Sequence, residues 1–116
     1  MSERVEFSFN DLAAFIYRWS TGNGFYDEGF VRDFDGHIAL IHSEASEALE
    51  EWREGHDFKE IYYKETKPEG IPIELADIII RVLDVCAHHD IDIEEAVWKK
   101  MAYNLNRSYR NGGKRS

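Results

Sequence analysis

The fold is decided by the stretch Ile73–His89, which reads IELADIIIRVLDVCAHH. Its length and its lack of Gly and Pro predict a helix. At about 100° per residue, the polar side chains form one narrow stripe, made of Glu74, Asp77, Arg81, Asp84 and His88. The rest of the circumference is apolar, which is typical of a helix inside a core. Because ionised carboxylates are rarely buried unless they are paired or bind metal, the stripe needs solvent, internal salt bridges or a metal-bearing cleft.

Three further helices are predicted on either side of this one, over residues 8–20, 35–54 and 92–109. Each shows apolar residues at helical spacing. We therefore expect an all-α fold in a single domain spanning residues 1–116, which is a length typical of one domain. The connection 56–70 is polar and contains Pro and Gly near its end, so it is interpreted as a loop.

Three signals mark the helix ends. Ser8 followed by Asp11 is a capping pattern for the first helix, and Gly55 is a stop signal for the second. Asp92 and Glu95 have the spacing of a capping box at the start of the last helix.

Composition excludes several classes of partner. The formal net charge is −9, which argues against nucleic acid and anionic membranes, since both favour a basic face. The only cysteine is Cys86, so no internal disulfide is expected and a reducing compartment suits the chain. The N-terminus lacks the apolar segment of a signal peptide, and no apolar run is long enough to span a bilayer. We therefore expect a cytoplasmic protein.

The second helix carries an acidic stripe beside its apolar stripe. Glu44 and Glu47 lie three residues apart in it, as do Glu74 and Asp77 in the central helix. If the two helices pack antiparallel, these four carboxylates converge. Hard oxygen donors suit Mg²⁺ or Mn²⁺, whereas zinc favours His or Cys and a di-iron bundle needs Glu-x-x-His pairs that are missing here. Without a cation the carboxylates repel, and at least one should hold a proton near neutral pH.

The ordered pair of motifs resembles a known family. Glu44-x-x-Glu47 and Glu74-x-x-Asp77, followed by Lys100-Met-x-x-Asn104-x-x-Arg107 and a Gly-Gly-Lys end, are similar to the motifs of the MazG-like all-α nucleoside triphosphate pyrophosphohydrolases. The similarity covers roughly residues 38–114. It implies a four-helix bundle-like, oligomeric fold and hydrolysis of a (deoxy)nucleoside triphosphate to the monophosphate and pyrophosphate, as in house-cleaning of nucleotide pools. A phosphoribosyl-ATP pyrophosphohydrolase is the alternative within the superfamily.

The resemblance also implies roles for individual residues. The four carboxylates would bind Mg²⁺ (or Mn²⁺), and Glu47 would in addition activate the attacking water. The side chains that would meet phosphate or sugar are Lys100, Asn104 and Arg107. Arg81 has two interpretations: it contacts a phosphate, or it forms a salt bridge with Asp84 and a glutamate. We favour the salt bridge because Asp84 is at i+3.

Self-association is expected because three other helices in so short a chain do not cover the apolar circumference of the central one. We therefore predict a homodimer or homotetramer. A different class of function remains open, in which the chain is a non-catalytic helical interaction module that uses the carboxylates as a metal site. The presence of all four predicted ligands favours the enzyme.

Overall fold

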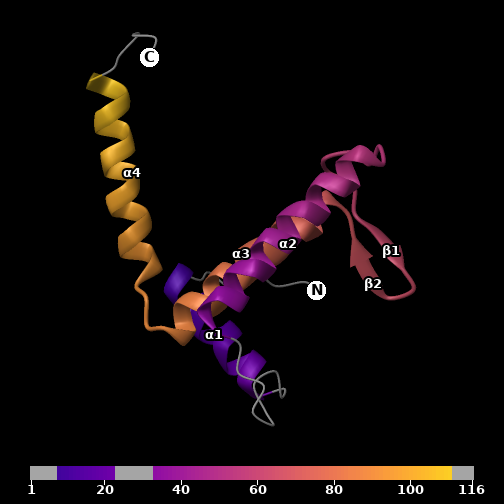
Figure 1. The fold of residues 1–116 in the computed structure, drawn as a ribbon, viewed down its shortest axis with the longest axis horizontal. Helices are drawn as coiled ribbons and strands as arrows, with labels where there is room; N and C mark the ends of the chain where they lie inside the picture. Colours follow the sequence, from indigo (N-terminus) through magenta and orange to yellow (C-terminus); the bar gives the residue numbers. More distant parts are fainter. Residues whose placement is uncertain (1–7, 23–32, 111–116) are drawn as a thin grey trace.

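Four α-helices and one β-hairpin form the part of the chain that the computed structural model describes, residues 8–22 and 33–110 (Figure 1). The elements, in chain order, are α1 (Phe9–Gly22), α2 (Phe34–Arg53), β1 (Tyr62–Lys64), β2 (Lys67–Glu69), α3 (Ile71–His88) and α4 (Ile93–Arg110). The all-α class is therefore confirmed, and each predicted helix is found within two residues of its expected ends. None of the described helices is both long and apolar enough to cross a membrane.

The predicted caps are present. The backbone N–H of Asp11 donates to Ser8 Oγ at 3.1 Å, and that of Glu95 donates to Asp92 Oδ1 at 3.1 Å. Only this half of the expected capping box is seen, because the Glu95 carboxylate lies 3.7 Å from Lys99 Nζ one turn further on. Gly55 follows the end of α2 with φ of +89°, the left-handed conformation that glycine adopts without strain.

The connection predicted as a loop contains the β-hairpin. Tyr62 pairs with Glu69 and Lys64 with Lys67 in an antiparallel register. A proline in β2 is compatible with this pairing because both strands of a two-stranded sheet are edge strands. Gly70 then turns the chain into α3 with φ of +123°, and a Cβ at this position would collide with the backbone carbonyl oxygen of Glu60. The hairpin thus brings the end of β2 against the start of α3.

Helices α2 and α3 run antiparallel and pack along each other, with the hairpin joining them at one end (Figure 1). Helix α1 packs on the other end of α3. The buried core lies at that contact, where Ala13 and Ile16 of α1 meet Leu83 of α3. The antiparallel packing assumed from the sequence is therefore confirmed, and it places the polar stripes of α2 and α3 side by side.

Helix α4 is fixed to the rest of the protein mainly at its first turn. Asn10 Nδ2 donates to Asp92 Oδ1 at 2.8 Å, and the Asn10 backbone N–H donates to Glu94 Oε1 at 3.2 Å. Beyond this point α4 projects away from α1, α2 and α3 (Figure 1). In one protomer the four helices therefore do not close into a compact bundle.

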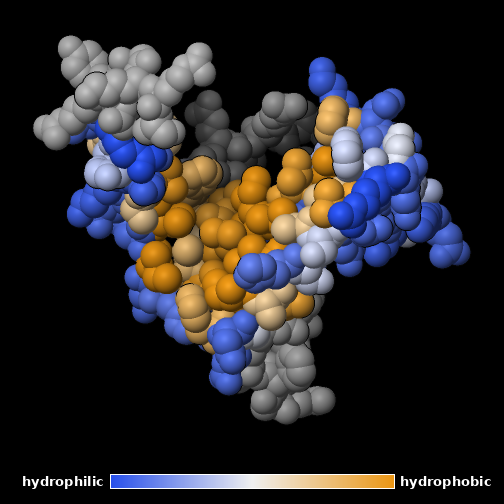
Figure 2. All heavy atoms as spheres, turned by 45° about the horizontal axis from the view of Figure 1, so that its top comes forward, coloured by the Kyte–Doolittle hydropathy of each residue, from blue (hydrophilic) through white to orange (hydrophobic). Residues whose placement is uncertain are grey.

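An apolar face lies exposed between α3 and α4. Figure 2 shows hydrophobic side chains gathered in the hollow beside α4. A cavity of about 200 Å³ in this face is lined by Phe9, Ile78, Ile79, Val82, Leu83, Ile93 and Val97. Ile79 is 53% exposed, and Trp98, further along α4, is 73% exposed. Exposed apolar surface of this kind is typical of interaction sites and of ligand-binding grooves.

Candidate functional site

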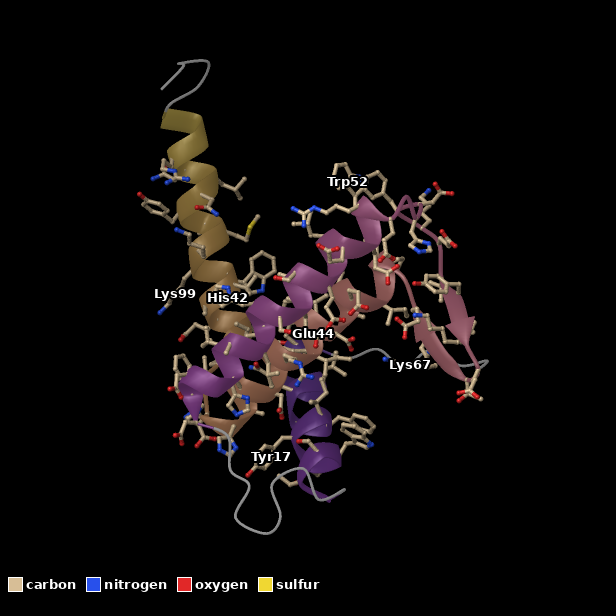
Figure 3. All side chains as sticks on the ribbon, turned by 45° about the vertical axis from the view of Figure 1, so that its right-hand side comes forward. Tyr17, His42, Glu44, Trp52, Lys67 and Lys99 are labelled. Atoms are coloured by element: carbon tan, nitrogen blue, oxygen red, sulfur yellow. The ribbon has the colours of Figure 1, made fainter. Side chains whose placement is uncertain are left out.

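Three of the predicted metal ligands come together between α2 and α3. Carboxylate oxygens of Glu44, Glu74 and Asp77 all lie within 4.8 Å of one another. Glu74 and Asp77 are three residues apart on α3 and so project from one side of it. Glu44 lies midway along α2, where that helix passes α3 (Figure 3). Glu74 is only 5% exposed, and the other two carboxylates are partly buried.

The fourth predicted ligand, Glu47, lies at the rim. Its position is one turn beyond Glu44 on α2, and its side chain is exposed. It is outside the 4.8 Å group, yet its negative charge is the second largest cause of the raised pKa of Glu74. Glu47 thus belongs to the same electrostatic cluster while remaining accessible to solvent.

Two buried carboxylates that were not predicted as ligands adjoin this group. Oxygens of Glu51 on α2 and Glu69 at the end of β2 lie within 4.8 Å of each other and of a Glu74 oxygen. Glu51 continues the acidic stripe of α2 one turn past Glu47, so its position near the other carboxylates could have been predicted from the helical spacing. Glu69 lies in the segment interpreted as a loop, and nothing in the sequence marked its approach to α3.

Burial and mutual repulsion shift the acidity of these groups. The pKa of Glu74 is raised to about 7, first by burial and then by the charges of Glu47 and Asp77. The pKa of Asp77 is also raised, again mainly by burial and next by Glu44, while Arg81 opposes this shift. These shifts agree with the prediction that, without a cation, at least one carboxyl group of the cluster holds a proton near neutral pH.

Arg81 pairs with a predicted metal ligand. Its Nε donates to Glu44 Oε1 at 3.3 Å across the α2–α3 contact. Asp84, the other predicted partner, accepts a hydrogen bond from Ser20 Oγ of α1 at 3.2 Å. The salt bridge to a glutamate is thus observed, and it holds one ligand of the acidic group in place.

The predicted phosphate-binding residues lie elsewhere in the protomer. Lys100, Asn104 and Arg107 are on the projecting part of α4, which does not pack against α2 (Figure 1). Lys100 Nζ and Arg107 Cζ lie 5.0 and 5.4 Å from the centre of the Tyr103 ring. The structure therefore does not bring them to the carboxylates within one chain, because α4 leaves the body after its first turn. The Gly-Gly-Lys end lies outside the described residues.

The donor set fits a hard divalent cation. The group of Glu44, Glu74 and Asp77 offers only carboxylate oxygens, which Mg²⁺ and Mn²⁺ favour. Glu74 supports this assignment further, because its buried carboxylate makes no hydrogen bond or ion pair with the described residues. A divalent ion would supply the positive charge that this carboxylate lacks.

Comparisons with known proteins add nothing to this assignment. No family model matches the chain, and neither the curated proteins nor the solved structures include a significant match. The resemblance to the MazG-like enzymes thus rests on the residues quoted from the sequence.

The raised pKa of Glu74 predicts how stability depends on pH in the absence of metal. Between its ordinary pKa of 4.5 and its folded value of about 7, the folded state binds more protons than the unfolded state. The free energy of unfolding should therefore fall as pH rises through this window, by up to roughly 3 kcal/mol from Glu74 at about 1.4 kcal/mol per pKa unit. Urea unfolding in EDTA at pH 5 and pH 7.5 measures this.

Glu74→Gln isolates the contribution of this residue, since Gln resembles the protonated carboxyl group. The variant should match the wild type at pH 5 and exceed it in stability at pH 7.5. Equal stability of the two proteins at both pH values would contradict the assignment.

Proposed function

We propose that this protein hydrolyses a (deoxy)nucleoside triphosphate to the monophosphate and pyrophosphate, with Mg²⁺ or Mn²⁺ as cofactor. The observation that carries the proposal is the convergence of Glu44, Glu74 and Asp77 from two antiparallel helices. Three of the four carboxylates in the motifs that resemble those of the pyrophosphohydrolases thus come together across the α2–α3 contact, and the fourth, Glu47, lies at the rim. The buried carboxylate of Glu74, which has no hydrogen bond or ion pair with the residues that the structure describes, supports a bound cation.

The chemistry follows from the charges. A triphosphate is repelled by a chain with net charge −9 unless cations bridge the two. When bound, the divalent cation supplies Lewis acidity and neutralises phosphate charge. Glu47, which is exposed at the rim, would accept the proton of the attacking water. Arg81 holds Glu44 in position through its 3.3 Å hydrogen bond.

A second copy of the chain completes the proposed assembly. The apolar face between α3 and α4 leaves Ile79 and Trp98 more than half exposed. The Cα radius of gyration is 17.3 Å, whereas a compact domain of this length has about 13 Å. Burying the face in a homodimer, or a homotetramer built from such dimers, removes this apolar surface from water and forms a helical bundle from two chains.

The same assembly accounts for the position of α4. Lys100, Asn104 and Arg107 project from the body of their own protomer, so we place them against the acidic site of a second copy. The positive charges of Lys100 and Arg107 complement the carboxylates and the phosphates bound there, and the Asn104 amide offers hydrogen bonds. Asn104 Oδ1 is shielded from solvent and has no hydrogen-bond partner among the described residues.

The activity is tested by assaying pyrophosphate release from the common NTPs and dNTPs with Mg²⁺ or Mn²⁺. Glu47→Gln should lower kcat by about 100-fold or more, the usual contribution of a general base, while nucleotide binding persists. Glu50→Gln is the matched control: it removes the same charge from the same helix at an exposed position that pairs with Arg53. Its kcat should stay within about twofold of the wild type, as expected of surface changes.

Two outcomes contradict the proposal. Release of inorganic phosphate instead of pyrophosphate would exclude the proposed bond cleavage. Absence of turnover with any nucleotide, including phosphoribosyl-ATP, would instead favour a non-catalytic interaction module.

Self-association is tested by light scattering at micromolar concentration. We expect a mass at least twice the 13.6 kDa of one chain. Ile79→Glu places a charge in the apolar face and should yield monomers, because an unpaired charge is costly to bury. Phe58→Glu, at a site that is 71% exposed and outside this face, should leave the assembly intact. A wild-type monomer, or equal behaviour of the two variants, would disprove the interface.

A further inference from the structure

A second group of carboxylates lies where three elements meet. Glu51 of α2, Glu69 of β2 and Glu74 of α3 place one oxygen each within a common 4.8 Å, and all three residues are buried. Glu51 and Glu69 lie outside the two paired motifs from which the first metal site was predicted. The group exists because the hairpin folds back onto the start of α3, where Gly70 allows the close turn.

Glu74 provides an independent reason to place a ligand here. The residue is only 5% exposed, and its carboxylate makes no hydrogen bond or ion pair with any residue that the structure describes. An ionised carboxylate in this position without such a partner is costly, which points to a positively charged ligand. A Glu74 oxygen lies within 4.8 Å of oxygens of Glu44 and Asp77 in one group, and of Glu51 and Glu69 in the other.

The two other members are held in place by neighbours. Tyr62 Oη lies 2.9 and 3.0 Å from the two oxygens of Glu51, and the Tyr62 ring stacks on His56 with 4.6 Å between ring centres. Lys67 Nζ lies 3.2 Å from Glu69 Oε2. Because the Lys67 side chain is 77% exposed, this ion pair is weak and is readily given up to a divalent ion.

We propose that Glu51, Glu69 and Glu74 form a second divalent-cation position, which shares Glu74 with the group of Glu44 and Asp77. A carboxylate has two oxygens and is able to bind one cation with each. Adjacent cations bridged by a carboxylate are typical of sites that bind phosphates. Tyr62 is a positioning residue, since its hydroxyl group orients Glu51 without itself belonging to the ligand set.

A rival group on the same surface is rejected. Glu51, Glu54 and His56 also place ligand atoms within 4.8 Å. However, the Glu54 side chain is 65% exposed and so is solvated without a metal, and His56 Nδ1 already lies 3.2 Å from Glu60 Oε1. Within the described part of the chain, a buried carboxylate without a hydrogen bond or ion pair is found only in the two groups that contain Glu74.

The cation would also have a structural effect. Its three ligands come from α2, β2 and α3, so binding would fasten the hairpin to the helix pair. The site does not depend on catalysis, and its existence is measured by metal binding alone.

The test counts bound Mn²⁺ by electron paramagnetic resonance on the full chain at pH 7.5, without nucleotide. Wild type should bind two Mn²⁺ per chain, and at saturation their shared carboxylate should produce a spin-coupled spectrum. Glu69→Gln should bind one Mn²⁺ with an uncoupled spectrum. Glu65→Gln removes the same charge from the exposed turn of the same hairpin and should still bind two.

A second variant keeps the test independent of how well Glu69→Gln folds. Tyr62→Phe retains all carboxylates and should weaken one of the two Mn²⁺ sites by about tenfold, as the loss of groups that orient metal ligands commonly does. A wild type that binds a single Mn²⁺ would overturn the proposal. The proposal would also be overturned if Glu69→Gln and Tyr62→Phe both bound the same number of Mn²⁺ ions as Glu65→Gln, with the same affinity.

These outcomes are separate from the proposed hydrolysis. Two coupled Mn²⁺ ions in a protein that turns over no nucleotide would keep the second site and reject the enzyme. If the wild type binds one Mn²⁺ and Glu69→Gln releases pyrophosphate as fast as the wild type, the enzyme is supported and the second site is rejected.

Discussion

Repulsion among buried carboxylates is the constraint on which the centre of this protein depends. Glu74 is almost fully buried at the start of α3, and carboxylate oxygens from α2, α3 and the hairpin lie within 4.8 Å of its own. Like charges at this distance inside a protein oppose folding unless one is protonated or a cation is bound. An antiparallel helix pair and a tight hairpin bring these groups together. This arrangement is the one expected if the protein folds around a cation.

The apolar residues impose a second constraint. Helix α3 is apolar around most of its circumference, but α1 and α2 cover only part of it, and α4 projects away (Figures 1 and 2). The acidic stripe and the exposed apolar face lie on different sides of the same helix. The proposed self-association and the proposed metal binding would therefore be linked through α3, because the partner that covers one side of the helix would support the geometry of the other side.

Much of the helical framework was predictable because it depends on local signals. Ser8 and Asp92 cap their helices as expected. The i,i+3 spacing predicted that four carboxylates converge, and three of them meet, whereas Glu47 lies at the rim. The hairpin was missed because its strands are three residues long, too short for an alternating pattern. Glu69 was missed with it. The direction of α4 was not predictable either, since helical periodicity identifies an apolar face and not the chain that covers it.

The most direct test of the cation site is differential scanning calorimetry of wild type and Asp77→Asn during an Mn²⁺ titration. A cation that binds only the folded state stabilises it by roughly 2.7 kcal/mol at about 100 times its Kd. Wild type should therefore melt at a higher temperature as Mn²⁺ is added. Without metal, Asp77→Asn should melt at the same temperature or higher, because one repelling charge is removed, and its rise with Mn²⁺ should be much smaller. Identical responses of the two proteins to Mn²⁺ would contradict the account.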